Sequence, residues 1–242
     1  MAIVEAGAPD AKAIVKGGSG PWADLGLTLP IFVAYHLGVV FLPVRNAADV
    51  VTRELVTLAD HSILAYSGLT LAIGAVYVGV LLVLGRGHTL RWSRFGMVAA
   101  EGVVYAIAMR MAAAYVVGRL HLGGAGVVHD RFTGLVMALG AGFYEEVAFR
   151  VILFGLGAKL LKILFPMPVP FKEKLLTLGW GVVAAGLFSA WHYVGPLGDP
   201  FQLQSFVFRW VCGMAFVVIY AFRGFAPAVW THALYDIWVM VL

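Results

Sequence analysis

Long apolar runs separated by short polar connectors dominate this chain of 242 residues. Each run is about twenty residues long, the length that a helix needs to cross roughly 30 Å of hydrocarbon with its own backbone satisfied. The pattern predicts an all-α protein, a polytopic transmembrane helical bundle of about seven membrane spans. We expect these spans at residues 25–43, 63–85, 97–118, 133–164, 173–195, 203–222 and 226–242.

Two segments depart from this pattern. Residues 1–24 are mildly polar and lack the basic region followed by an apolar region that marks a cleaved signal peptide. Residues 44–62 are only moderately apolar and contain interspersed charges, which favours an interfacial helix or an ordered loop. We therefore expect a polar N-terminal segment at 1–24 and a single transmembrane domain at 25–242.

Composition supports a membrane protein and argues against other classes. The chain is 62% hydrophobic and only 12% charged, with a mean hydropathy of +0.91, values that soluble globular domains do not approach. A net charge of +4 would suit nucleic acid, but the Lys and Arg residues lie in connectors and form no continuous basic face. Cys212 is the single cysteine, which excludes an internal disulfide and a thiolate metal cluster.

The basic connectors also predict an orientation. Lys and Arg are concentrated in the N-terminal segment and in the connectors at 86–96 and 159–174. By the positive-inside rule these parts are cytoplasmic. We therefore expect a multi-pass protein of a cell inner membrane with a cytoplasmic N-terminus, whose partners include the lipid bilayer but not nucleic acid.

Three ionisable residues, Glu145, Glu146 and Arg150, lie within two helical turns of the fourth span. A charge at membrane depth costs at least a few kcal/mol, so it must be paired, hydrated or functional. Glu146 and Arg150 are four residues apart and can form an ion pair on one helix face. Glu145 is rotated by about 100° and faces a different neighbour, which favours a general base beside a neutralised pair. Alternatively, the three charges only lock helices together.

Helix register favours a functional partner for Glu145 on the fifth span. Phe188 and His192 share one face of that span, and an intramembrane histidine is about as often a packing group as a catalytic one. Pro168 is the middle of the turn between the two spans, 23 residues after Glu145 and 24 before His192. In an antiparallel hairpin, Glu145 and His192 would therefore lie at nearly the same depth.

The last span adds one imidazole and one carboxylate, because His232 and Asp236 are four residues apart on one face. Counting the helix rise from the connectors places His232 and His192 about 15 Å apart in depth if the helices are straight. A single site therefore requires an irregular connector, which we expect at residues 195–204.

Three motifs in this order on three late helices resemble those of the CPBP family of intramembrane proteases, which includes the type II CAAX prenyl endopeptidases and bacterial Abi proteins. The resemblance covers about residues 130–242, the expected protease-like core. The motifs are Glu-Glu-x-x-x-Arg, Phe-x-x-x-His and His-x-x-x-Asn/Asp, carried here by Glu145, Glu146, Arg150, Phe188, His192, His232 and Asp236.

The resemblance implies an endopeptidase that hydrolyses a peptide bond of a membrane-associated or lipidated protein or peptide. Glu145 and His192 would activate a water molecule as the nucleophile. His232 and the residue at position 236 would stabilise the oxyanion. The prenyl endopeptidases resembled here typically have Asn at that position, so Asp236 must be protonated to donate, or must accept a hydrogen bond and orient His232.

The resemblance gives supporting roles to Glu146, Arg150 and Phe188, the first two of which would hold Glu145 and its helix in place. The metal requirement is open. Glu145, His192 and His232 could bind zinc, because two imidazoles and a carboxylate form a known catalytic ligand set. They come from three helices and carry no built-in metal geometry, so we favour a mechanism with no required metal.

Other polar groups in the spans have structural interpretations. Glu101 and Arg110 are predicted to pair with neighbouring helices or to line a substrate cavity, and His36 is predicted to be a core histidine without a role. Two rival functions remain open: a non-proteolytic scaffold or bacteriocin-immunity factor of the same fold, and a transporter. The transporter is less favoured, because no inverted repeat is visible.

Overall fold

A computed structural model describes residues 21–42, 46–49, 55, 62–84, 91–119, 130–166, 169–195 and 198–242. Every regular element in these ranges is helical, which confirms the all-α prediction. The elements are α2 (Pro21–Val39), α4 (Ile63–Leu84), α5 (Trp92–Arg119), α6 (Arg131–Gly140), η1 (Ala141–Glu145), η2 (Val147–Leu156), α7 (Gly157–Leu164), α8 (Pro170–Trp191), α9 (Leu203–Arg223) and α10 (Phe225–Met240). The predictions for residues 1–20 and for most of 44–62 lie outside the described residues.

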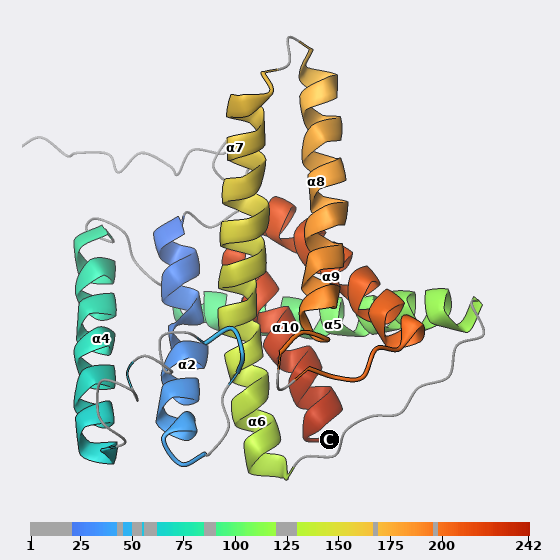
Figure 1. Cartoon of the computed structure of the whole chain (residues 1–242). Coiled ribbons are helices and arrows are strands. Elements are labelled where there is room, and N and C mark those ends of the chain that lie inside the picture. Colours follow the sequence, from blue (N-terminus) through green and yellow to red (C-terminus); the bar gives the residue numbers. More distant parts are fainter. Residues whose placement is uncertain are drawn as a thin grey trace, which may run out of the picture.

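The number of membrane spans is a separate question from the number of helices. Five helices of the described chain are long and apolar enough to cross a membrane, namely α2, α4, α5, α8 and α9. A further helix runs without a break through α6, η1, η2 and α7, where the fourth span was predicted. Figure 1 shows α5 running across this long helix rather than beside it, so the two cannot both stand close to the membrane normal. The count of seven spans therefore stays a prediction.

Helix α10 lies at the centre of the packing. It contacts α2, α5, α6, η1 and α9, and most residues of its first two turns are buried. A glycine permits one of these approaches, because a Cβ added at Gly142 of η1 would lie 2.7 Å from Cβ of Ala233. Small residues at such crossings let helix backbones meet in a membrane. The polar part of η1 is thereby held against the middle of α10.

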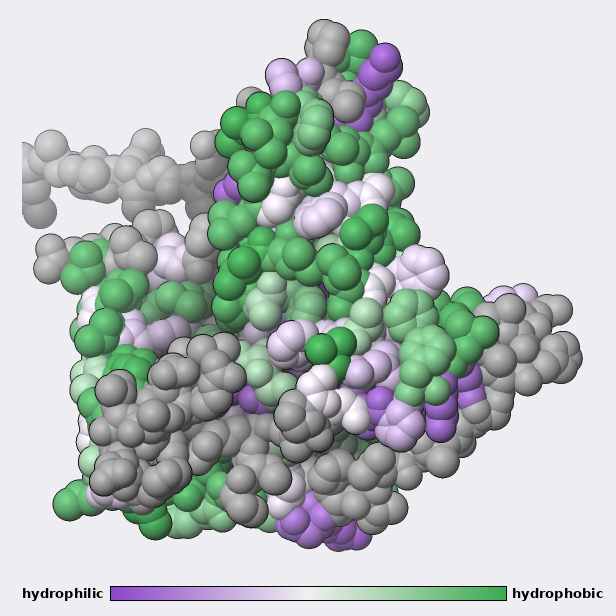
Figure 2. Space-filling model, in the orientation of Figure 1, coloured by the Kyte–Doolittle hydropathy of each residue, from purple (hydrophilic) through white to green (hydrophobic). Residues whose placement is uncertain are grey.

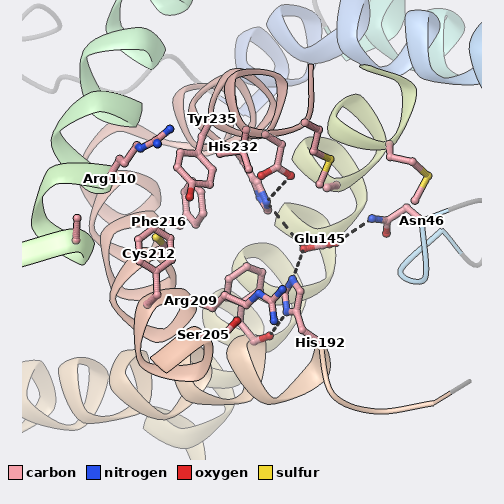
Figure 3. A pocket seen from close by; sticks show the side chains of 18 of the residues that line it. Asn46, Arg110, Glu145, His192, Ser205, Arg209, Cys212, Phe216, His232 and Tyr235 are labelled. Carbon is pink, nitrogen blue, oxygen red and sulfur yellow. Dashed lines mark hydrogen bonds and ion pairs between the residues drawn. The ribbon is translucent and has the colours of Figure 1, made fainter. Parts of the chain in front are cut away.

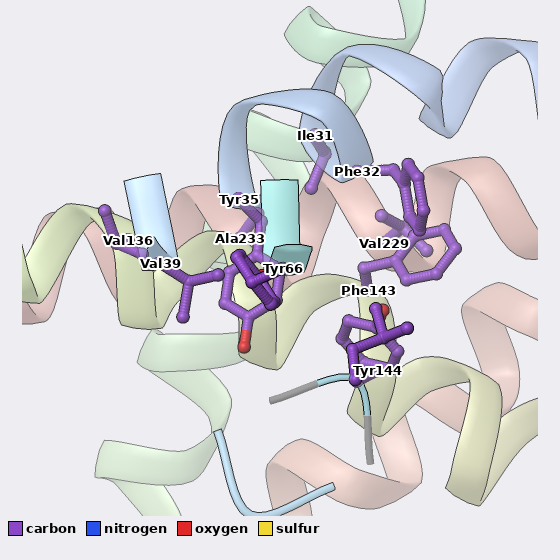
Figure 4. Packing of buried hydrophobic residues seen from close by; sticks show 11 residues of the cluster. Ile31, Phe32, Tyr35, Val39, Tyr66, Val136, Phe143, Tyr144, Val229 and Ala233 are labelled. Atoms are coloured by element: carbon purple, nitrogen blue, oxygen red, sulfur yellow. The ribbon is translucent and has the colours of Figure 1, made fainter. Parts of the chain in front are cut away.

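Aromatic packing fixes η1 from the other side. Phe143 and Tyr144 directly precede Glu145, and both are buried in a cluster with Phe32 and Tyr35 of α2 (Figure 4). The rings of Tyr35 and Tyr144 meet edge to face with centroids 5.6 Å apart. The hydroxyl of Tyr144 also shares a 2.7 Å hydrogen bond with Nε2 of His36, the buried histidine to which no role was assigned.

The surface carries the apolar belt of a membrane protein. Helix α4 packs mainly against α2 among the described elements and leaves large side chains such as Leu64 and Leu71 exposed. Figure 2 shows hydrophobic side chains over much of α7 and α8, with hydrophilic side chains at one side of their tip. Apolar surface on this scale is stable in lipid but not in water. The chain is therefore a membrane protein.

A glycine joins α9 to α10 and permits a cap between distant parts of the chain. Gly224 has φ +98°, in the left-handed region that favours glycine. Beside it, Oδ2 of the buried Asp24 accepts a 2.7 Å hydrogen bond from the backbone N–H of Phe225. The Asp24 carboxylate thus satisfies one of the free N–H groups at the start of α10.

Gly224→Ala is expected to destabilise the fold by about 2 kcal/mol or more, because the new Cβ would require strained backbone and would meet the Asp24 carboxylate. Thermal unfolding in detergent measures the effect. Gly179→Ala is the matched control, since its Cβ would enter open space in the middle of α8 and should be neutral or stabilising by up to about 1 kcal/mol. Equal melting temperatures for the two variants would contradict the prediction.

Candidate active site

The structure brings together three predicted site residues from three separate helical segments. Glu145 is the last residue of η1, His192 immediately follows α8, and His232 lies in the middle of α10. Oε2 of Glu145 is 3.9 Å from Nε2 of His192 and 3.9 Å from Nε2 of His232. Figure 3 shows the Glu145 carboxylate between the two imidazoles. His192 and His232 therefore lie close together, without the difference in depth that was expected for straight helices.

His192 lies at the end of α8, which ends earlier than the sequence predicts. The fifth span was expected to continue to residue 195, but the helix ends at Trp191 and His192 caps it. The carbonyl oxygen of His192 accepts a 2.8 Å hydrogen bond from the N–H of Asp199, which folds the chain back against the helix end. The described residues between α8 and α9, 192–195 and 198–202, are not helical. An irregular connector is therefore present in the region around residues 195–204, where the sequence predicted one.

The ring of His192 has a defined orientation. Its Nδ1 is 3.0 Å from the carbonyl oxygen of Phe188. A carbonyl oxygen only accepts, so Nδ1 carries the proton and donates it. Nε2 of a neutral ring then presents its lone pair toward Glu145.

Glu146 and Arg150 form the predicted ion pair. NH1 of Arg150 is 3.1 Å from Oε1 of Glu146, and both side chains are fully buried. The guanidinium lies between two aromatic rings, with Cζ 4.2 Å from the ring centroid of Phe188 and 4.7 Å from that of Phe216. Such desolvated cation–π contacts are worth about 2 kcal/mol. Phe188 thus supports the site by holding Arg150.

The same Glu146 oxygen orients His232. Nδ1 of His232 is 2.7 Å from Oε1 of Glu146, and its ring stacks on Phe216 with centroids 4.5 Å apart. The opposite nitrogen, Nε2, is 3.4 Å from Oδ2 of Asp236. Because the carboxylate of Glu146 accepts at Nδ1, Nε2 is the nitrogen that faces the centre of the site.

One contact of Glu145 comes from a segment that sequence reasoning passed over. Nδ2 of Asn46 donates a 2.8 Å hydrogen bond to Oε1 of Glu145, and the Asn46 side chain is buried. The two residues are 99 positions apart, and Asn46 lies in the stretch 44–62 that was read as an interfacial helix or loop. No periodic pattern in that stretch signals the contact.

The site opens into a cavity of about 620 Å³. The cluster around Glu145 lines one part of it, and polar or cationic side chains from α5, α9 and the connector before α9 line other parts (Figure 3). These are Arg110, Gln202, Gln204, Ser205 and Arg209. A cavity of this size and mixed lining can hold an extended segment of a few residues.

The other two charged residues singled out in the spans have different positions. Arg110 lines the cavity, with its Cζ 4.3 Å from the ring centroid of Trp238. Glu101 does not line it, and instead accepts hydrogen bonds from Nε and NH2 of Arg223 at 2.5 and 3.0 Å. Both residues were predicted either to line a cavity or to form a structural ion pair. Arg110 lines the cavity, and Glu101 forms the ion pair.

The donor types of Glu145, His192 and His232 suit zinc. Among the described residues, no three His, Cys, Asp or Glu side chains are grouped so that they could hold a metal ion. The closest separations within the trio, 3.9 Å, join Glu145 to each imidazole.

Sequence similarity links part of the chain to a known family. A family model described as type II CAAX prenyl endopeptidase Rce1-like matches residues 127–238. No curated protein and no solved structure matches the chain. The matched stretch contains the three carboxylates and both imidazoles of the site, together with Arg150 and Phe188. This part of the chain, just under half of it, is therefore similar to the type II CAAX prenyl endopeptidases, which supports the resemblance to the CPBP family.

Proposed function

We propose that the protein is a glutamate-dependent intramembrane endopeptidase. The observation that carries this proposal is the environment of Oε2 of Glu145, which is buried beside the cavity and faces Nε2 of two histidines. No hydrogen-bond partner occupies this oxygen in the described part of the chain. Among the described residues, Oε2 of Glu146 has no hydrogen-bond partner either, but Glu146 does not line the cavity, so the position beside the cavity distinguishes Glu145. An oxygen left open beside a cavity is suited to bind a reacting group.

Water is the proposed nucleophile. A water oxygen can lie within about 2.8 Å of both Oε2 of Glu145 and Nε2 of His192, because these atoms are 3.9 Å apart. Glu145 takes one proton as the water oxygen attacks the scissile carbonyl carbon. The tetrahedral intermediate collapses when that proton passes to the leaving nitrogen and the C–N bond breaks. The products are a new carboxylate and a new amine.

His232 is the proposed stabiliser of the developing oxyanion. Its Nδ1 donates to Glu146, so Nε2 can donate to an oxyanion when it also carries a proton. Oδ2 of Asp236, 3.4 Å from Nε2, is an acceptor that favours this doubly protonated ring. Asp236 is then an acceptor that orients His232 rather than a direct donor to the oxyanion. Preorganised donors of this kind are among the largest contributions to acyl-transfer catalysis.

The proposed substrate is a membrane-associated or lipidated protein or peptide, cleaved by a multi-pass enzyme of a cell inner membrane with a cytoplasmic N-terminus. Support comes from the match to a prenyl endopeptidase family and from the position of the site within a lipid-facing bundle. The basic residues near the tip of α7 and α8, among them Lys162 and Lys172, are the ones that assign this connector to the cytoplasm.

The proposed function is tested with purified protein in liposomes and a fluorogenic peptide library carrying C-terminal prenyl-cysteine motifs, analysed by mass spectrometry. We expect cleavage at one defined bond.

Because the mechanism uses no metal, the rate should stay within about twofold after dialysis against a strong chelator. Atomic spectroscopy should find well under one zinc per chain in the active preparation. Loss of activity in chelator that zinc restores would overturn the metal-free mechanism. Intact peptides under every condition would favour the scaffold or immunity factor.

A further inference from the structure

The two oxygens of the Glu145 carboxylate have different environments. Oε1 accepts the 2.8 Å hydrogen bond from Nδ2 of Asn46, whereas Oε2 faces Nε2 of His192 and of His232. A carboxylate with both oxygens open could rotate about its last bond and present either one. The bond from Asn46 removes that freedom.

The Asn46 amide is itself held in one orientation. Its Oδ1 accepts a 2.8 Å hydrogen bond from the backbone N–H of Ala48, as in an Asx turn. An N–H group can only donate, so this contact identifies the oxygen of the amide and leaves the NH2 group directed at Glu145. The carbonyl of Asn46 also accepts a 3.0 Å hydrogen bond from the N–H of Asp49, which closes residues 46–49 into a turn.

This turn is anchored to the core of the bundle. Asp49 is almost fully buried, and its Oδ2 accepts a 2.5 Å hydrogen bond from the hydroxyl of Tyr35. Tyr35 belongs to α2, is completely buried and packs against Tyr144, the residue before Glu145. The turn and the catalytic segment therefore rest on the same aromatic cluster, which sets the distance between Asn46 and Glu145.

We propose that Asn46 is a positioning residue of the active site, which holds Oε1 of Glu145 so that Oε2 is the oxygen that takes the proton from water. This role presupposes the proposed peptidase function. It assigns a task in the reaction to a residue outside the stretch that matches the family model.

The test compares kcat and KM of purified variants in liposomes. Asn46→Ala is expected to lower kcat by about 10- to 100-fold with KM within twofold, because a misplaced base slows the chemical step without weakening substrate binding. Asn46→Asp keeps the size of the side chain but turns a carboxylate toward Oε1 of Glu145. It should therefore lower kcat further than Asn46→Ala does. A purely space-filling role predicts the reverse order.

Tyr35→Phe is the matched control. It removes the hydrogen bond that anchors the same turn through Asp49 but keeps the ring and touches neither Glu145 nor the cavity. It should lower the melting temperature and lower kcat by less than Asn46→Ala does, because the turn loses an anchor while the amide that contacts Glu145 remains. A Tyr35→Phe variant that loses as much kcat as Asn46→Ala would overturn the direct role of Asn46. A higher KM with unchanged kcat in Asn46→Ala would overturn it too, because Asn46 would then be a substrate contact.

A second measurement does not depend on activity. In a double-mutant cycle of thermal unfolding, Asn46→Ala should lower the melting temperature of the wild type by more than it lowers that of Glu145→Ala. Equal shifts in both backgrounds would overturn the contact. The wild-type protein could cleave no substrate while the cycle still shows coupling between Asn46 and Glu145. That result would overturn the proposed function but would support the hydrogen bond between the two residues.

Discussion

Glu145→Gln should reduce kcat by about 1,000-fold while the protein remains folded, since general bases contribute roughly 10²- to 10⁴-fold. Glutamine has nearly the size of glutamate, and its carbonyl oxygen can still accept the hydrogen bond from Asn46. It cannot take a proton from water at the position of Oε2. Cleavage rates in liposomes and the melting temperature in detergent check both parts of the expectation.

Glu173→Gln is the matched control for this variant. Glu173 lies in the first turn of α8, is 43% exposed and pairs with Lys162 at 3.1 Å, well away from the cavity lining. The same chemical change there should leave kcat within about twofold. A purified, folded Glu145→Gln protein with wild-type cleavage would refute the glutamate-dependent mechanism. A loss of folded protein in Glu145→Gln alone would instead identify Glu145 as a structural residue.

Arg150→Met should destabilise the fold by about 3–5 kcal/mol, the usual cost of leaving one partner of a buried ion pair uncompensated. Glu146 would keep its charge with no exposure to solvent and would lose the guanidinium 3.1 Å away. Methionine fills much of the space between the rings of Phe188 and Phe216, which limits the contribution of a cavity. The melting temperature in detergent, and the yield of folded protein, measure the loss.

A double variant separates charge from packing. Glu146→Gln combined with Arg150→Met removes both charges, and the glutamine oxygen can still accept from Nδ1 of His232. It should recover most of the stability lost in Arg150→Met, because exchanging both partners avoids an unpaired buried charge. An equally unstable double variant would show that ring contacts of the guanidinium dominate. Lys162→Met, which breaks the exposed pair with Glu173, should change stability by less than about 1 kcal/mol.

Local spacing predicted much of the site because helices repeat regularly. The pair Glu146 and Arg150, and the pair His232 and Asp236, are each four residues apart and lie together in the structure as that spacing requires. Counting residues from the turn at Pro168 also predicted that Glu145 and His192 lie at nearly the same depth in the membrane. These inferences needed only the helix rise and an antiparallel hairpin.

Features that depend on tertiary contacts were not predictable in this way. The end of α8 at Trp191 rather than at residue 195 is determined by the fold of the connector, whose Asp199 N–H bonds to His192. The hydrogen bond between Asn46 and Glu145 joins positions whose separation has no relation to any helical repeat. Similarly, hydropathy alone placed Arg223 in a connector, although it ends α9 and pairs with Glu101.

Because Asp24 caps α10, the catalytic part of the chain depends on a residue outside the stretch that carries its motifs. Asp24 belongs to α2, yet its carboxylate holds the first N–H of the helix that carries His232. The stretch that matches the family model begins about a hundred residues later, at residue 127. A graft or a minimal enzyme built from that stretch alone would start α10 with an unsatisfied end. The family motifs are therefore portable only as part of a scaffold that includes the first described helix.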